Sequence, residues 1–352
     1  MTPQSSDDPL TITVAGYEFD RVKALSSGRV PIEGCEVRFE RASIGDMNTH
    51  VFDGPRTRDV TEVGLSPYLL AYANDDFRAY TLIPVFPLRL FRHKSIFIRK
   101  DRGISRPEDL RGKKIGTPGY STTSLTWIRG ILQHEYGVKP EEIRWVIADK
   151  DSSADLAGAR SAQEQMIPEN VEITYGTGGK DESELIVDGE VDALFHAAEP
   201  RAFTEGHPQI RRLFADSRAA ERTYFAKTGM FPIMHAVAVR TDVVEANRWL
   251  PEAVFRGYSG AKQQDYRDLR TKAWAMSSLP WLAQEADATR ELMGENFWPY
   301  GIEPNRTALS AILEYSHEQG LASRHLAVEE MFHSSTWKLA DTVRQEDHGS
   351  SP

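Results

Sequence analysis

The stretch PEDLRGKKIGTPGYSTTSLTWIRGILQHEY, which covers residues 107–136, indicates what kind of fold this chain adopts. Residues 107–116 predict one helical turn, a glycine turn and a short strand. Residues 121–136 predict a helix, because apolar side chains repeat there at the spacing of one helical face. That face consists of Leu125, Ile128, Ile131, Leu132 and Tyr136. A strand that leads directly into a helix is the repeating unit of α/β proteins.

The same alternation continues on both sides of this stretch. Before it, strands are predicted at 10–15, 36–39, 60–63, 80–84 and 95–99, with helices at 20–25 and 66–73. After it, strands are predicted at 143–148, 171–175, 191–195 and 232–239, and the chain is largely helical from residue 243 to residue 332. Short links between strands and helices predict an α/β fold with mostly parallel strands, and the number of strands favours two sheets.

Composition and charge narrow the classes of partner. The chain has 352 residues, enough for about two domains of ~150 residues each, and 40% of them are hydrophobic. The formal net charge is −10. Nucleic acids and anionic membranes both favour a basic protein face, so neither is expected as the main partner. An anionic small molecule is compatible with this charge, because a few clustered arginines can dominate a cleft.

The sequence lacks the features of a disulfide-bonded, metal-binding, secreted or membrane-spanning protein. A single cysteine, Cys35, excludes an intrachain disulfide and a cysteine-rich metal site. The histidines form no i, i+4 ligand pair on a predicted helix, so we expect no metal and no other cofactor. The first ten residues are polar and acidic, unlike a secretory leader, and no run approaches the ~18 apolar residues of a membrane span. If the chain is the full-length product, we expect a cytoplasmic protein.

The predicted strand ends supply most of the candidate binding residues. In open α/β sheets, ligands bind beyond the carboxyl ends of the strands. This rule selects residues 17–21, 66–68, 117–123 and 196–201, together with 231–235, where the chain enters a strand. The candidates from these segments are Arg21, Ser66, Tyr120, Ser121, Thr122, Thr123, His196, Arg201 and Phe231.

The segment FPLRLFRHK, residues 86–94, places cations and a histidine between aromatic residues. One interpretation is a basic loop on the surface. The other is an anion site, in which Arg89 or Arg92 grips a carboxylate with two parallel hydrogen bonds. The neighbouring aromatic rings would suit a planar ligand.

Two further features each allow two interpretations. One is the start of the helix at 121–136, and the other is the histidine in the strand at 232–239. Free backbone N–H groups and the hydroxyl groups of residues 121–124 suit a bound carboxylate or phosphate. Ser121 is also a plausible helix cap, and both roles are compatible. His235 lies in an otherwise apolar strand, where it is either a buried core residue or a functional residue at the strand entry.

Several of these segments resemble known families. The segments DLRGKKIG (109–116) and VDGEVDA (187–193) resemble the second-lobe signatures of type 2 periplasmic-binding-protein-like folds. Four longer segments resemble the 4,5-dihydroxyphthalate decarboxylase family, and the similarity extends from about residue 17 to residue 332. They are PVFPLRLFRH (84–93), WIRGILQHEYG (127–137), TGMFPIMH (228–235) and FWPYGIEPNR (297–306).

The resemblance implies two lobes with the ligand cleft between them. Lobe 1 would contain residues 1–98 and 236–352, including the helical C-terminal third, and lobe 2 residues 99–235. It also implies a cytoplasmic, homo-oligomeric carboxy-lyase that needs no organic cofactor. The expected reaction converts a hydroxylated phthalate, such as 4,5-dihydroxyphthalate, to a monocarboxylate such as protocatechuate. The chain departs from the family pattern at PGYS (118–121) and at HAAEPR (196–201), which leaves its exact substrate open.

The chemistry of such a reaction assigns roles to the candidates. A general acid must protonate the ring carbon, and the spectator carboxylate must be held while the departing one is poorly solvated. We expect His93 or His235 to donate the proton and the other to polarise a ring hydroxyl, with His196 as a third candidate. Arg89, Arg92 and residues 121–123 would hold the spectator carboxylate, with Arg21 and Ser66 in the cleft wall. The alternatives are a solute-binding protein of an ABC-type transporter and a related lyase acting on another aromatic or cyclic carboxylate.

Overall fold

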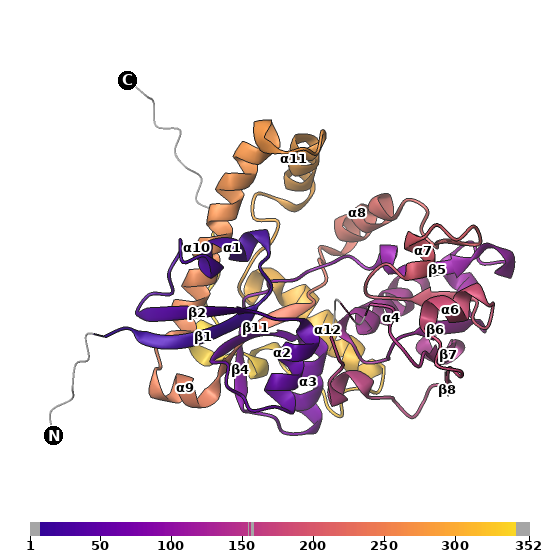
Figure 1. Ribbon diagram of the computed structural model, residues 1–352, viewed down its shortest axis with the longest axis horizontal. Helices are drawn as coiled ribbons and strands as arrows, with labels where there is room; N and C mark the ends of the chain where they lie inside the picture. The colour runs from indigo at the N-terminus through magenta and orange to yellow at the C-terminus, as the bar shows by residue number, and fades with distance from the viewer. Residues whose placement is uncertain (1–7, 154, 156–157, 343–352) are drawn as a thin grey trace.

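The computed structural model describes residues 8–153, 155 and 158–342. These residues form two lobes, each built around one β-sheet (Figure 1). The strand order is β2-β1-β3-β11-β4 in the first sheet and β10-β5-β9-β6-β7-β8 in the second. This confirms the predicted α/β fold with two sheets. Within the described residues, no helix is both long and apolar enough to cross a membrane.

The first sheet combines four strands that run in one direction with an antiparallel one that returns late in the chain. Its strands are β1 (Leu10–Gly16), β2 (Cys35–Arg41), β3 (Val60–Gly64), β4 (Tyr80–Ile83) and β11 (His235–Arg240). Strand β1 runs parallel to β2 and β3, whereas β11 runs antiparallel to β3 and β4. The helices that follow the first three strands are α1 (Asp20–Ser26), α2 (Ile44–Phe52) and α3 (Leu65–Asn74).

The second sheet has a parallel half and an antiparallel edge. Its strands are β5 (Ile96–Arg99), β6 (Lys114–Thr117), β7 (Arg144–Ile147), β8 (Ile173–Tyr175), β9 (Ala193–Phe195) and β10 (Ile210–Arg212). Strands β6, β7, β8 and β9 pair in parallel, and β5 pairs antiparallel with β9 and β10. The helices of this part are α4 (Thr123–Tyr136), α6 (Glu182–Val187), α7 (Arg201–Thr204) and α8 (Ser217–Thr228).

The chain passes between the two sheets twice, once between β4 and β5 and once between β10 and β11. The boundary expected at residues 98 and 99 falls inside β5, which pairs in the second sheet. The boundary expected at residues 235 and 236 falls at the start of β11, which pairs in the first sheet. We therefore propose that lobe 2 begins near residue 96 rather than at residue 99.

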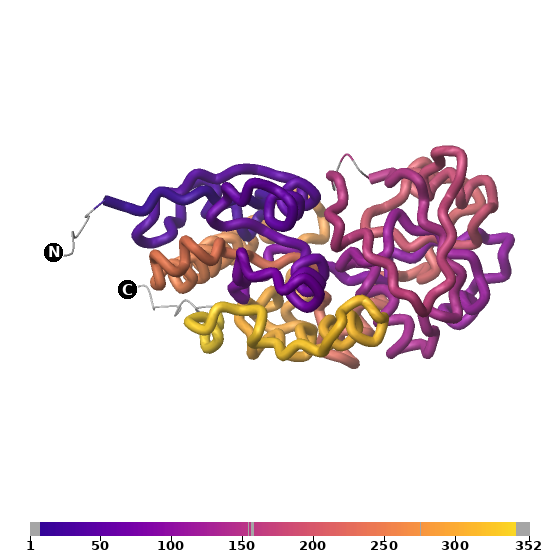
Figure 2. Tube along the Cα trace, turned by 90° about the horizontal axis from the view of Figure 1, so that it is seen from below, coloured from indigo at the N-terminus to yellow at the C-terminus, as the bar shows by residue number. Residues whose placement is uncertain are grey.

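The C-terminal third is helical and contacts both lobes. Its helices are α9 (Thr241–Ala246), α10 (Leu250–Thr271), α11 (Leu282–Met293) and α12 (Arg306–Glu318), with a π-helical turn η6 (Lys272–Met276) after α10. Helix α10 packs on α1, and α12 packs on α4 of the second lobe. The end of α10 and helix α11 extend away from the body (Figure 1), and the yellow C-terminal segment lies along one side of the first lobe and reaches the second at α12 (Figure 2). The short 3₁₀ helices are η1 (His93–Ser95), η2 (Lys100–Arg102), η3 (Pro107–Leu110), η4 (Pro140–Glu142), η5 (Ala162–Gln165), η7 (Glu303–Asn305), η8 (Val328–Met331) and η9 (Ser334–Thr336).

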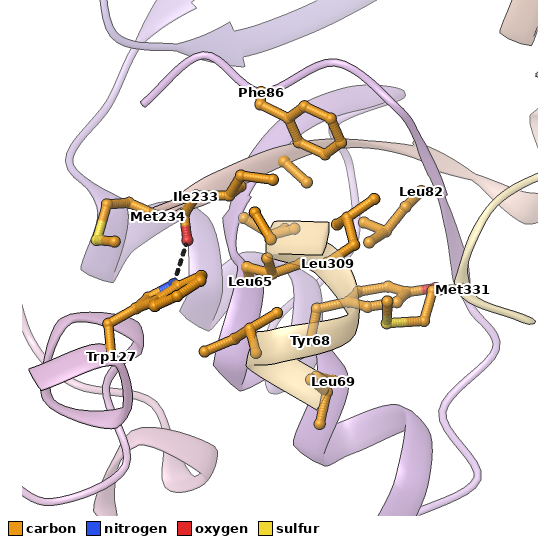
Figure 3. Packing of buried hydrophobic residues seen from close by; sticks show 14 of the residues in the cluster. Leu65, Tyr68, Leu69, Leu82, Phe86, Trp127, Ile233, Met234, Leu309 and Met331 are labelled. Carbon is orange, nitrogen blue, oxygen red and sulfur yellow. Dashed lines mark hydrogen bonds between the residues drawn. The ribbon is translucent and has the colours of Figure 1, made fainter. Parts of the chain in front are cut away.

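A continuous apolar core joins the lobes at the start of β11 (Figure 3). Trp127 of α4 is fully buried, and its indole N–H donates a hydrogen bond of 2.9 Å to the carbonyl of Ile233. Ile233 and Met234 lie in the same buried cluster as Leu65 at the start of α3. This junction fixes the beginning of α4 relative to the first sheet, and the cavity described below lies beside it.

The helix starts differ from the sequence-based expectation by at most two residues. The helices expected from residues 20, 66 and 121 begin at Asp20, Leu65 and Thr123, and the N-cap of the last one is Thr122, not Ser121. Three of the described α-helices, α2, α7 and α8, were not predicted at all. Helix α8 buries only Tyr224 among its twelve residues, so its sequence has no apolar stripe to detect.

Candidate functional site

A cavity of about 350 Å³ lies between the two lobes. Strand ends of both sheets meet there, as the topological rule predicts. Tyr17 follows β1, Gly64 ends β3, Pro118 follows β6, Asp151 follows β7 and Ala197 follows β9. Much of the remaining wall is apolar and comes from Phe19, Ile44, Leu88, Leu90, Leu125 and Met234. A space of this size and character suits a small, planar organic ligand.

A carboxylate–imidazole pair, Glu62 and His235, forms one polar part of the wall. His235 Nδ1 lies 3.1 Å from Glu62 Oε2, and Glu62 is fully buried. The other carboxylate oxygen accepts the backbone N–H of Tyr17 at 2.9 Å. Strand register creates the pair: His235 of β11 stands opposite Gly64, and Glu62 stands opposite Val237, so both side chains lie on one face of the sheet.

This pair is suited to moving a proton. With Nδ1 hydrogen-bonded to Glu62, the ring of His235 is fixed in orientation and Nε2 is left for a ligand in the cavity. A buried carboxylate behind an imidazole also stabilises the imidazolium form, as in hydrolytic triads.

The start of α4 forms a second polar part. Thr122, Thr123, Ser124 and Leu125 all line the cavity. Thr122 caps the helix with extended backbone, and its buried Oγ1 has no hydrogen-bond partner. The first N–H groups of a helix lack intrahelical partners and carry a partial positive charge, so they attract an anion.

Arg92 adds a buried cation to the wall. Its Nη1 donates to the carbonyl of Ala197 at 2.9 Å, and its Nε lies 3.2 Å from the sulfur of Met234. It forms no ion pair with any carboxylate of the described residues. Burial lowers the pKa of Arg92 to about 9, which still leaves it charged at neutral pH. A buried guanidinium without a protein carboxylate is a ready partner for a carboxylate ligand.

Sequence reasoning missed three residues of this site. Tyr17 and Arg160 line the cavity, and Glu62 orients His235. Arg160 pairs with Asp151 in the segment after β7, where the sequence shows no clear periodicity. Glu62 did leave a signal, because a lone carboxylate stands in a strand that is otherwise apolar or small.

His93 is a correction to the expected proton donor. Its ring packs against Phe214 and Tyr224, each with its centroid 5.1 Å away, and neither ring nitrogen has a hydrogen-bond partner. Burial lowers the pKa of His93 to about 4, so the ring is neutral near pH 7. The side chain does not line the cavity, and we do not retain it as a proton donor.

Arg89 and Phe231 also lie away from the cavity. Arg89 donates to the carbonyl of Phe231 at 3.0 Å and to Asn305 Oδ1 at 2.6 Å. The ring of Phe231 stacks on Phe91 with centroids 4.6 Å apart. Both residues therefore hold the segment between β4 and β5 against its neighbours inside the protein. The local sequence could not show that their polar and aromatic contacts are internal.

Four further candidates are used in contacts outside the cavity lining. Arg21 lies over the ring of Trp298, 3.9 Å from its centroid, and Arg201 pairs with Asp181 at 2.6 Å. Tyr120 is fully buried beneath Arg129, and Ser121 Oγ donates to the carbonyl of Gln163 at 2.7 Å.

Two candidates lie directly behind the wall. Ser66 is buried and donates its backbone N–H to Thr123 Oγ1 at 3.0 Å. This bond ties the start of α3 to the start of α4. His196 is fully buried and contacts Glu182 and Asp151, of which only Asp151 reaches the cavity.

Comparison with known proteins gives two kinds of similarity. Residues 90–162 match the family model described as "NMT1/THI5 like". The chain is 34% identical to "4,5-dihydroxyphthalate decarboxylase" of Comamonas testosteroni over 329 residues, covering 93% of this chain and 97% of the relative. It is 31% identical to the enzyme of the same name from Pseudomonas putida over 217 residues, covering 61% and 81%.

Solved structures show the same fold at low sequence identity. The aliphatic sulphonate-binding protein SsuA of Escherichia coli superposes with a TM-score of 0.53 at 13% identity, covering 94% of this chain and 99% of that one. A putative sulfonate-binding protein of Methylobacillus flagellatus superposes with a TM-score of 0.54 at 14% identity, covering 94% and 93%. These likenesses identify the two-lobe fold of periplasmic binding proteins.

Proposed function

Because the chain belongs to the family of the 4,5-dihydroxyphthalate decarboxylases, we propose that it removes one carboxylate from a hydroxylated aromatic dicarboxylate such as 4,5-dihydroxyphthalate. One observation supports this chemistry above the others: the buried Glu62–His235 pair opens into a cavity of about 350 Å³. A protein that only binds a solute has no need of a proton donor held in this way.

His235 is the proton donor in this proposal. The proton moves from Nε2 to the ring carbon that bears the departing carboxylate. The bond between that carbon and the carboxylate then breaks, its electron pair returns to the ring, and CO₂ leaves. Glu62 holds the imidazole through Nδ1 and stabilises its charged form before the transfer.

The rest of the cavity wall gives the two carboxylates of the substrate different surroundings. Arg92 and the start of α4 bind the spectator carboxylate through charge and free N–H groups. The apolar side chains of Leu88, Leu90 and Phe19 face the rest of the ligand. A departing carboxylate in such surroundings is poorly solvated, which favours its conversion to neutral CO₂.

The test is CO₂ release from 4,5-dihydroxyphthalate by His235→Gln and Glu62→Gln. Loss of the acid lowers kcat about 100- to 10,000-fold, the usual contribution of general acid catalysis. Glu62→Gln lowers kcat less, because the imidazole remains but its orienting carboxylate does not. His50→Gln, on the partly exposed end of α2, is the matched control and keeps the wild-type rate.

Three outcomes would contradict the proposal. Near-wild-type turnover by His235→Gln would remove the assigned acid. Binding without CO₂ or water loss across a panel of hydroxylated benzene-dicarboxylates would favour a solute-binding protein. Loss of water instead of CO₂ would favour a related lyase acting on another aromatic or cyclic carboxylate.

We further propose that the protein acts in the cytoplasm as a homo-oligomer. In support, four large apolar side chains are exposed between α10 and α11, in the part that extends from the body: Trp274, Met276, Leu279 and Trp281. Light scattering should give a mass above that of one chain, and Trp274→Ser/Trp281→Ser should lower it. A monomeric wild type would contradict the assembly, and recovery from the periplasmic fraction of its natural host would contradict the location.

A further inference from the structure

Behind the cavity wall, three ligand-type side chains gather that the proposed reaction does not use. They are Asp151 after β7, Glu182 in the first turn of α6 and His196 directly after β9. One potential ligand atom from each lies within 4.8 Å of the other two. Glu182 and His196 are fully buried, whereas Asp151 lines the cavity.

The arrangement around His196 is that of co-ligands rather than of hydrogen-bonding partners. Nε2 lies 3.0 Å from Glu182 Oε1 and 3.4 Å from Asp151 Oδ1. Despite these distances, Nε2 is a buried atom without a hydrogen-bond partner, because neither oxygen lies in line with the ring N–H direction. Bonds of 2.0–2.2 Å to a tetrahedral zinc ion separate neighbouring ligand atoms by about 3.3–3.6 Å, which matches the distance to Asp151 and is slightly longer than the distance to Glu182.

The hydrogen bond of Nδ1, the other ring nitrogen of His196, also favours Nε2 as a metal ligand. Nδ1 lies 3.0 Å from the carbonyl of Ala198, so a proton on Nδ1 has an acceptor and the lone pair of Nε2 faces the carboxylates. In the opposite tautomer, Nδ1 accepts the N–H of Ala198 at 3.1 Å, but the Nε2 proton then has no acceptor. Metal-binding histidines usually donate their second N–H to such a carbonyl.

The two carboxylates are also held from outside the cluster. The backbone N–H of Ser153 donates to Asp151 Oδ1 at 2.8 Å. The backbone N–H of Ser152 lies 3.2 Å from Glu182 Oε2. Arg160 already pairs with Asp151, whereas within the described residues Glu182 has only the imidazole of His196 as a possible cationic partner. Burial by itself lowers the pKa of His196, but the carboxylates of Asp151 and Glu182 raise it to about 9. A protonated His196 is therefore the alternative to a metal ion as the cation beside these two carboxylates.

We propose that Asp151, Glu182 and His196 bind a zinc ion at the edge of the cavity. One imidazole and two carboxylates are ligands that Zn²⁺ accepts, and three protein ligands leave a position open. Ca²⁺ and Mg²⁺ prefer six or more oxygen ligands, which this buried cluster does not supply. The inference concerns binding alone and does not depend on the decarboxylase reaction.

The experiment is calorimetric titration of ZnCl₂ into the full chain after EDTA treatment and dialysis, without substrate. We expect one ion per chain with a Kd below about 1 µM, equivalent to about −8 kcal/mol. Co²⁺ should bind the same site and give the visible absorption of low coordination number. His196→Gln and Asp151→Asn should each weaken Zn²⁺ binding at least about 100-fold.

A matched control addresses chance capture by other histidines. The rings of His317 and His325 lie with centroids 3.6 Å apart and are tilted by 45°, so His325→Gln breaks up another pair of imidazoles and should leave the tight site intact. Asp151 lies in a partly exposed loop, so Asp151→Asn keeps the test valid if His196→Gln fails to fold. No tight binding by the wild type, or binding unchanged in both site variants, would overturn the inference. Zn²⁺ binding in a chain that releases no CO₂ would leave the inference standing and count only against the proposed function.

Discussion

What a buried histidine can do depends on the groups that face its two ring nitrogens. In His235, Nδ1 faces a carboxylate oxygen at 3.1 Å and the ring borders a cavity. In His93, both nitrogens face apolar and aromatic neighbours and lack hydrogen-bond partners. The first environment supports a charged ring and proton transfer, whereas the second disfavours charge.

His93 should make stability depend on pH. Its pKa is about 4 in the folded protein, below the usual 6.5, so the unfolded chain takes up a proton first as the pH falls. Stability is therefore complete above pH 6.5 and falls by up to about 3 kcal/mol as the pH drops towards 4. Urea unfolding of wild type and His93→Leu at pH 7 and pH 4.5 should show a smaller loss in the variant.

The same variant tests the site assignment. His93→Leu should retain CO₂ release, because the side chain lies outside the cavity lining. It should also be as stable as wild type at pH 7, since it removes buried nitrogens that have no partners. A pH dependence identical to that of wild type would show that His93 is not buried in its neutral form.

Arg92 should act mainly on substrate binding. Arg92→Met keeps the buried volume but removes the cation that faces the cavity, so kcat/KM should fall about 10- to 100-fold, the worth of a hydrogen bond to a charged group. The effect should be largest on KM. Arg201→Met is the matched control, because Arg201 pairs with Asp181 away from the cavity. Equal effects of the two substitutions in steady-state kinetics would contradict this assignment.

At the scale of elements, α4 and α12 approach each other closely at a glycine. A Cβ atom added to Gly130 of α4 would lie 2.0 Å from the ring of Tyr315 on α12. Only hydrogen at this position allows the ring to pack against the helix. The contact therefore sets the distance between a lobe 2 helix and the C-terminal third.

Gly130→Ala should destabilise the protein by about 1–3 kcal/mol, as overpacking does, although alanine is the better helix former. Chemical denaturation measures the change. In a Tyr315→Ala background the same substitution should be neutral or stabilising, because the clash is gone. A cost of equal size in both backgrounds would mean that the two helices are not in contact at this point.

At the scale of the whole molecule, a buried arginine links the lobes. Arg129 of α4 is almost fully buried, and its Nε donates to Gln319 Oε1, beyond the end of α12, at 2.8 Å. Gln319 in turn donates to the carbonyl of Thr126 at 3.0 Å. These bonds join lobe 2 to the C-terminal third, which belongs to lobe 1, so the two lobes should unfold together.

Gln319→Leu should lower the free energy of unfolding by about 1.5–3 kcal/mol, because the guanidinium loses its acceptor while it stays buried. Arg129→Met/Gln319→Leu removes both polar partners and should restore most of the loss. Denaturant unfolding followed by tryptophan fluorescence provides the measurement. A double variant as unstable as the single one would show that the pair does not act as a unit.

The sequence by itself determined the α/β fold, the strand–helix unit at 107–136 and the family, because these depend on local periodicity and contiguous motifs. It also identified Arg92, Thr122, Thr123 and His235, which line the cavity. Only the tertiary structure separated His235 from His93, since the sequence does not show which groups face each ring. The register of β11 against β3 places Glu62 behind one of them, and the other packs against α8. Likewise, Asp151, Glu182 and His196 come together only because β7 and β9, the two neighbours of β6, end at the same edge of the second sheet, a relation that sequence distance cannot express.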